Sequence, residues 1–133
     1  MNPFVLEPSM LTMGGVFYPT GYAIIMFPDV AETQRVGQQL LDQGISAKVM
    51  HLKPETVLRD ISRTDDGADA PLPSVGTEGA TVRTLDELAR KGQHGLLVHA
   101  DSEEETEAVM QVVRTAPFSF AQKYRMLAIQ DLQ

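Results

Sequence analysis

The sequence predicts a mixed α+β fold built from two strand–helix–strand units with an insertion between them. Residues 21–52 and 94–129 each contain an apolar strand pattern, a helical pattern and a second strand pattern, in that order. Residues 53–92 lie between these units and carry helical patterns and an acidic loop. This order fits a ferredoxin-like sandwich, which is the split βαβ arrangement.

The alternative is a small doubly wound α/β fold with an all-parallel sheet. Strands of such a sheet are covered on both faces, so their sequences are apolar without alternation. The segments "ISAKVMHL" (45–52) and "KYRMLAI" (123–129) alternate between apolar and polar residues instead. We therefore favour the ferredoxin-like arrangement. A length of 133 residues is typical of one domain, so we expect residues 1–133 to form a single domain.

Residues 1–20 are expected to form an N-terminal hairpin or arm. In "SMLTMGGVFYPT", Gly14 and Gly15 lie between two short apolar segments, which is typical of a two-residue hairpin turn. The next segment, "GYAIIMF" (21–27), is apolar on both alternating faces. It predicts a strand with a neighbour on each side.

The ends of the first unit's helix and the start of the insertion have local signals. Asp29 followed by Glu32 predicts the start of a helix, and Gly44 predicts its end. In the insertion, Pro54 is suited to the first position of a short helix. The acidic, proline-containing segment 63–74 predicts a loop.

A second short helix of the insertion is expected to begin near Thr81 or Thr84 and to end at Gly92. The second unit then begins with the apolar strand "HGLLVHA" (94–100). Ser102, with Glu105 three residues later, predicts the start of its helix.

Composition excludes several classes of function. The chain has no cysteine, so it has no thiolate metal site, disulfide or cysteine nucleophile. Its net charge is −7 and its 11 Lys and Arg residues are scattered, which argues against nucleic acid as a partner. We find no signal-peptide pattern and no apolar run of ~20 residues, and therefore expect a cytoplasmic protein with no membrane partner.

The segment "PSVGTEGAT" (73–81) is the strongest candidate for a ligand site. It lacks the lysine of a P-loop and the G-x-G-x-x-G spacing of a dinucleotide-binding loop. It still offers two glycines ahead of a helical pattern, where backbone N–H groups can bind an anion. The alternative is a flexible capping turn, with positive φ at one glycine or both. The candidate ligand-binding residues are Gly76, Thr77, Gly79, Thr81 and Arg83.

His51 and His99 each lie near the end of a predicted strand, where a histidine can act as an acid, a base or a metal ligand. In the ferredoxin-like arrangement these two strands are antiparallel neighbours, so the histidines would lie towards opposite edges and share no metal. We favour partly buried structural histidines. The acidic "DDGAD" lacks the spacing of a calcium loop. We therefore expect no metal, no cofactor and no catalytic residue.

The segment "LARKGQHGLLVHADSEEETEAVMQVVRTAP" (88–117) resembles the second half of the general stress protein domains of small bacterial proteins. The whole chain is also similar to small uncharacterised bacterial proteins that carry "GGVFYPTG" and "SVGTEGATV". The resemblance implies a ferredoxin-like βαβ half and a stress-related protein. It implies no catalytic residue.

The function expected from these observations is a non-catalytic binding or regulatory module that works as a homo-oligomer, most simply a homodimer. One sheet face of a ferredoxin-like sandwich has no helices. Apolar side chains on that face would need a cover, which a second copy can supply; they belong to Tyr22, Ile24 and Met26 or to Ala23, Ile25 and Phe27. The alternative is a protein or enzyme that binds an anionic small molecule or nucleotide at residues 73–84.

Overall fold

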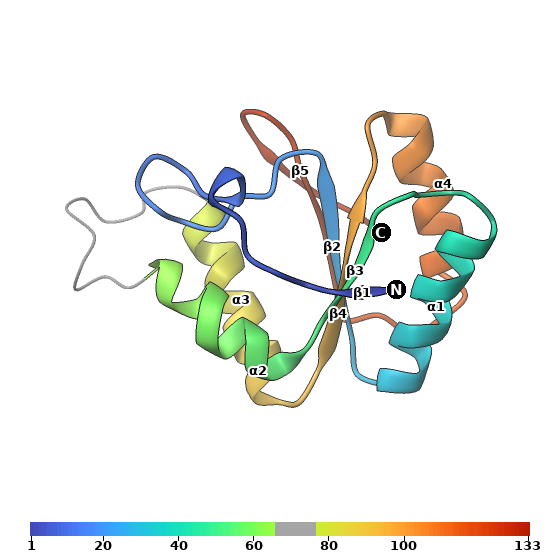
Figure 1. The fold of residues 1–133 in the computed structure, drawn as a ribbon, viewed down its shortest axis with the longest axis horizontal. Helices are drawn as coiled ribbons and strands as arrows, with labels where there is room; N and C mark the ends of the chain where they lie inside the picture. Colours follow the sequence, from blue (N-terminus) through green and yellow to red (C-terminus); the bar gives the residue numbers. More distant parts are fainter. Residues whose placement is uncertain (66–76) are drawn as a thin grey trace.

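The computed structural model describes residues 1–65 and 77–133. A mixed sheet lies between two layers of helices, with α1 and α4 on one face and α2 and α3 on the other (Figure 1). The α+β class predicted from the sequence is confirmed. The helices are α1 (Val30–Asp42), α2 (Pro54–Thr56), α3 (Thr77–Arg90) and α4 (Glu103–Val113). The strands are β1 (Asn2–Pro3), β2 (Tyr22–Phe27), β3 (Val49–Leu52), β4 (His94–His99), β5 (Phe120–Tyr124) and β6 (Ile129–Asp131).

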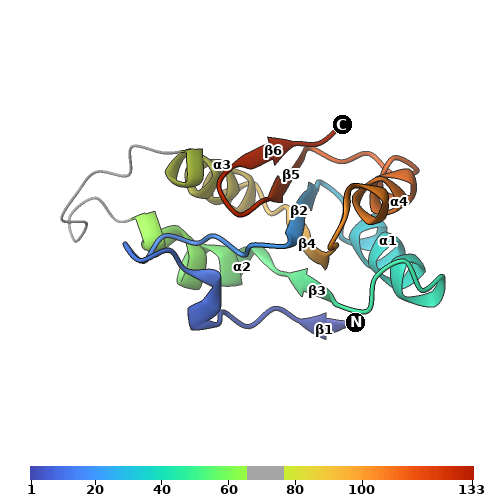
Figure 2. The ribbon, with the colours of Figure 1, turned by 90° about the horizontal axis from the view of Figure 1, so that it is seen from above.

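The strand order within the described chain is β1-β3-β4-β2-β5-β6, which can be followed from one edge to the other in Figure 2. β1 and β3 are parallel, whereas β3–β4, β4–β2, β2–β5 and β5–β6 are antiparallel. β2 and β3 therefore run in the same direction with β4 between them. The all-parallel alternative is wrong.

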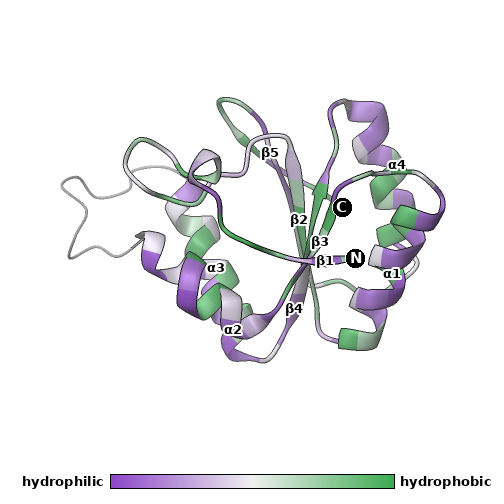
Figure 3. Cartoon of the chain, in the orientation of Figure 1, coloured by the Kyte–Doolittle hydropathy of each residue, from purple (hydrophilic) through white to green (hydrophobic). Residues whose placement is uncertain are grey.

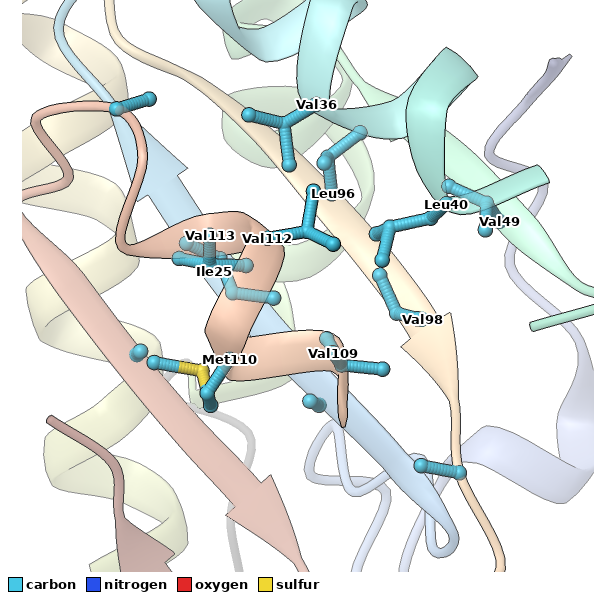
Figure 4. Close-up of a cluster of buried hydrophobic side chains, with 14 of the residues drawn as sticks. Ile25, Val36, Leu40, Val49, Leu96, Val98, Val109, Met110, Val112 and Val113 are labelled. Carbon is cyan, nitrogen blue, oxygen red and sulfur yellow. The ribbon is translucent and has the colours of Figure 1, made fainter. Parts of the chain in front are cut away.

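Helices α1 and α4 cover one face of the sheet, and both begin where the sequence predicts. The Asp29 carboxylate accepts the N–H of Ala31 at 2.8 Å, and Gly44 adopts a φ of +66° after the last turn of α1. Figure 4 shows the cluster beneath them, in which side chains of both helices meet side chains of the central strands. The buried members it labels include Ile25, Val36, Leu40, Leu96, Val98, Val109 and Val113.

The insertion and the N-terminal arm cover the opposite face. Ile24 and Met26 of β2 are fully buried there, against Ile61 and Leu85 of the insertion and Phe17 of the arm. Hydrophobic residues therefore line the sheet, and the helices carry both hydrophobic and hydrophilic residues (Figure 3). The face that we expected a second copy to cover is covered by the chain itself, so the reason for expecting a homo-oligomer does not hold.

Two predicted strands are shorter in the structure. The segment 45–52 forms a strand over 49–52, because Ser46 turns inward and its hydroxyl donates to the carbonyl of His99 at 2.7 Å. The segment 123–129 is interrupted by a turn in which the N–H of Arg125 donates to the carbonyl of Ala128 at 2.9 Å. Met126 and Leu127 at the tip of this turn are 80% and 94% exposed.

The N-terminal arm forms the predicted hairpin with a different loop. Leu11 and Phe17 form an antiparallel bridge, and the N–H of Thr12 donates to the carbonyl of Val16 at 2.8 Å. The loop therefore spans residues 13–15, and Gly15 closes it with a φ of +84°. The strand β1 was not predicted from the sequence.

Helix α3 begins at Thr77, earlier than the predicted Thr81 or Thr84, and ends at the predicted Gly92, whose φ is +83°. Gly79 lies inside this helix and does not have a positive φ, whereas Gly76 lies outside the described residues. Within 1–65 and 77–133, no helix combines the length and the apolar character needed to cross a membrane.

Candidate functional site

A pocket of about 210 Å³ lies at one end of the sheet, where β4 leads into α4 and β5 into the turn before β6. Figure 1 shows this end of the sheet at the top. Buried and charged side chains meet here, which distinguishes it from the apolar clusters of the two sheet faces. Its lining includes Gly21, Asp101, Ser102, Thr106, Lys123 and Arg125. We call this site the Lys123 pocket.

Lys123 reaches the pocket because of its place in β5. Side chains of a strand alternate between the two faces, so Lys123 shares the α1/α4 face with Ala121 while Tyr124 packs on the other. The residue is only 5% exposed. Its Nζ donates to the carbonyl oxygen of Ala100 and, at 3.2 Å, to Oγ1 of Thr106.

The charge of Lys123 has no contacting counter-charge within the described part of the chain, since no carboxylate there lies within 4.0 Å of its Nζ. Burial lowers the pKa of this amine below its ordinary 10.5, and the nearby Arg125 lowers that pKa further. Asp101 and Glu105 act in the opposite direction on the pKa, from a longer distance.

The start of α4 forms one wall of the pocket. The Ser102 hydroxyl accepts the N–H of Glu105 at 3.1 Å, and the Glu105 carboxylate accepts the N–H of Asp101 at 2.7 Å. The positive end of the helix dipole therefore faces the pocket. Arg125, on the other side, forms an ion pair with Glu103 at 3.2 Å.

Two of the three N–H groups of the Lys123 ammonium have acceptors, so the third can donate to a ligand. The two acceptors are the carbonyl oxygen of Ala100 and Oγ1 of Thr106. A carboxylate or phosphate in the pocket would accept the third and would supply the missing negative charge. Gly21 borders the same space with a φ of +89°, where a side chain would be strained.

Of the residues predicted at the 73–84 junction, Thr77 and Gly79 lie in the first turn of α3, and Thr81 and Arg83 lie further along the same helix. Thr81 is 3% exposed and its hydroxyl donates to Oε1 of Gln122 at 2.7 Å, so it ties α3 to β5. Gly79 is buried within α3, and Arg83 is exposed on the same helix. Thr77 is the first residue of α3, and Gly76 lies outside the described residues.

His51 and His99 lie apart, as the antiparallel register requires. His51 stacks on His94 with ring centroids 5.1 Å apart, and its Nε2 lies 2.9 Å from Nδ1 of His94. His99 packs edge-on against Tyr22 at 5.0 Å, and its Nε2 lies 3.1 Å from Oδ1 of Asp101. Across the described ranges, no three His, Asp or Glu side chains are grouped closely enough to hold a metal ion.

Sequence reasoning missed Lys123 altogether. The available signal was a lysine between apolar residues in a predicted strand, "FAQKYRML". Exposed edge strands often carry lysines, so the pattern has no functional meaning until the helix above it is known.

No family model matches the chain, and searches of curated proteins and of solved structures return no significant match.

Proposed function

We propose that this chain is a non-catalytic binding module for a small anionic molecule, which it holds in the Lys123 pocket. The observation that carries this proposal is a lysine residue that is only 5% exposed and whose Nζ has no carboxylate in contact among the described residues. The anionic ligand of the sequence hypothesis is kept, while its location moves from residues 73–84 to the end of the sheet.

The unfavourable free energy of burying the charged Lys123 amine supports this proposal. An ionised amine without a counter-charge destabilises a folded protein by on the order of several kcal/mol. An apolar residue such as Met would fill the same volume without this penalty. A ligand that brings the missing negative charge would stabilise the folded state by its binding free energy.

The surroundings favour a carboxylate or a phosphate over a cation or an apolar molecule. The start of α4 and the side chain of Lys123 direct positive charge towards the pocket, while the guanidinium of Arg125 is paired with Glu103. Asp101 also lines it, but the side chain of Asp101 is 72% exposed and lies 3.1 Å from His99. The volume of about 210 Å³ suits a small metabolite better than a nucleotide.

A ligand titration with inorganic phosphate, lactate and acetate tests this proposal. We expect a saturable rise in melting temperature for the wild type, because the ligand binds the folded state only. Lys123→Met should lose this response, and Lys91→Met, which changes an exposed lysine, should keep it. The proposal fails if none of the three anions binds the wild type, or if Lys123→Met binds them equally well.

We also propose that the fold is ferredoxin-like, with residues 53–92 as an insertion that covers the second sheet face. The strand order β3-β4-β2-β5, antiparallel between neighbours, supports this because it is the order of two interlocked βαβ units. The resemblance of residues 88–117 to general stress protein domains is consistent with it. A stress-related role predicts that cells lacking the protein grow normally until they are stressed.

A further inference from the structure

The environment of Lys123 suits a reactive amine as well as an ammonium. We propose that Lys123 forms a reversible imine with small carbonyl compounds that carry an anionic group, such as 2-oxo acids. This inference rests on the proposed anion site and names the ligand class that the site would take.

The first support is the number of hydrogen-bond acceptors around Nζ. A neutral amine has two N–H groups and one lone pair, and the structure provides two acceptors, the carbonyl of Ala100 and Oγ1 of Thr106. Both hydrogens are then used, and the lone pair occupies the remaining tetrahedral position. Lys123 also lines the pocket, so a carbonyl compound bound there would approach the amine at this position.

The second support is the contrast with the other lysines of the chain. The sequence has three more, Lys48, Lys53 and Lys91, and all three are exposed. An exposed amine stays protonated at neutral pH and reacts slowly with carbonyl groups, because the lone pair is the nucleophile. Burial lowers the pKa of Lys123, so its amine form is more populated than that of a solvated lysine.

The third support is the place available for the anionic group. A 2-oxo acid has its carboxylate next to the carbonyl carbon, so the carboxylate would lie beside Nζ. The positive end of α4 borders the same pocket, and Arg125 lines it with a guanidinium that is bonded to Glu103 and Gln130. The positive end of α4 would hold the carboxylate while the carbonyl carbon faces the amine.

The reaction balances without an oxidant or a reductant. The Nζ lone pair adds to the carbonyl carbon, a proton moves from nitrogen to the former carbonyl oxygen, and a carbinolamine forms. That hydroxyl then takes a second proton and leaves as water, which gives the C=N bond. The Asp101 carboxylate, 3.1 Å from Nε2 of His99, borders the pocket as a group that can relay these protons.

The neighbours of Nζ remain hydrogen-bonded after the reaction. The protonated imine keeps one N–H, which can still donate to the carbonyl of Ala100. Thr106 does not depend on the amine, since its own hydroxyl donates to the carbonyl of Ser102 at 2.8 Å. The imine can therefore form without leaving a new buried polar group unpaired.

Reductive trapping tests the inference. The full chain is incubated with glyoxylate or pyruvate and sodium cyanoborohydride, and the adduct is located by intact mass and peptide mapping. We expect modification of Lys123 ahead of the three exposed lysines, protection by added lactate, and slower trapping with acetone, which lacks the carboxylate. Lys123→Arg and Lys123→Met should both lose this adduct, with circular dichroism to show that each is folded.

The outcomes separate this inference from the proposed function. Lactate binding without any trapped adduct at Lys123 overturns the imine and leaves the anion site intact. Equal labelling of all four lysines also overturns it. If lactate and phosphate do not bind at all, the anion site fails, and trapping at Lys123 by acetone and pyruvate at equal rates would then show a reactive lysine without anion recognition.

Discussion

At the scale of single residues, Lys123 has the least favourable environment for its charge of the four lysines. It is 5% exposed, whereas Lys48, Lys53 and Lys91 are in solvent. Its two hydrogen bonds satisfy N–H groups but do not neutralise the charge. A buried charge of this kind is expected to destabilise the fold, and a role in binding explains its presence better than packing does.

The pH dependence of stability should report this burial. The pKa of Lys123 is lowered in the folded state, so between that lowered value and its ordinary 10.5 the unfolded chain binds more protons. The free energy of unfolding of the wild type should therefore rise, relative to Lys123→Met, as the pH increases from 7 towards 10.5. Urea denaturation of both proteins at several pH values measures the difference. A difference that falls with pH would contradict the burial of a charged amine.

The His51–His94 pair gives a second titration, at acid pH. Burial lowers the pKa of both rings below 6.5, and their mutual repulsion lowers the pKa of His51 further. Below pH 6.5 the unfolded chain therefore takes up protons first, and the folded state loses stability as the pH falls. We expect a His51→Gln/His94→Gln double variant to lose less stability between pH 7 and pH 5 than the wild type. Equal losses in the two proteins would show that the pair is not perturbed.

At the scale of elements, the start of α4 links the fold to the candidate site. Ser102 caps the helix through the N–H of Glu105, and the same turn borders the Lys123 pocket. Ser102→Ala removes the acceptor and should lower the free energy of unfolding by about 1 kcal/mol. Ser102→Thr keeps the hydroxyl and serves as the matched control. Chemical denaturation measures the free energy of unfolding of both variants and of the wild type. An alanine variant as stable as the wild type would contradict a stabilising cap at Ser102.

The elements predicted correctly are those whose signals lie within a few residues of one another. Asp29, Gly44 and Ser102 define their helix ends by local hydrogen bonds or by backbone conformation, so the sequence is sufficient. The start of α3 was missed because neither predicted start residue caps the helix: the Thr84 hydroxyl donates to the carbonyl of Ala80 within it, and the Thr81 hydroxyl donates to Gln122, 41 residues away. Such a partner is not visible in a local pattern.

The candidate site could not be predicted for the same reason. Whether a lysine in a strand is exposed or buried depends on which face the strand turns to which helix. Lys123 is buried because Thr106 of α4 and Ala100 lie above it. Sequence patterns favoured the glycines of 73–81 instead, of which Gly79 lies in the first turn of α3 and Gly76 lies outside the described residues.

At the scale of the whole molecule, both faces of the sheet are covered by the chain itself. Ile24 and Met26 are fully buried on the side where a second copy was expected. We now expect a monomer at micromolar concentration, which multi-angle light scattering measures directly. A stable dimer would show that another surface associates, such as the exposed turn with Met126 and Leu127.

The most direct test of the Lys123 pocket is an NMR titration of the Lys123 side chain, with and without lactate. We predict a pKa below the ordinary 10.5 in the free protein, and a higher pKa when the anion is bound, because the ligand supplies the missing counter-charge. Lys91 should show no response to lactate, since it lies at the end of α3 and in solvent. A Lys123 pKa at or above 10.5 that lactate leaves unchanged would contradict both the buried charge and the anion site.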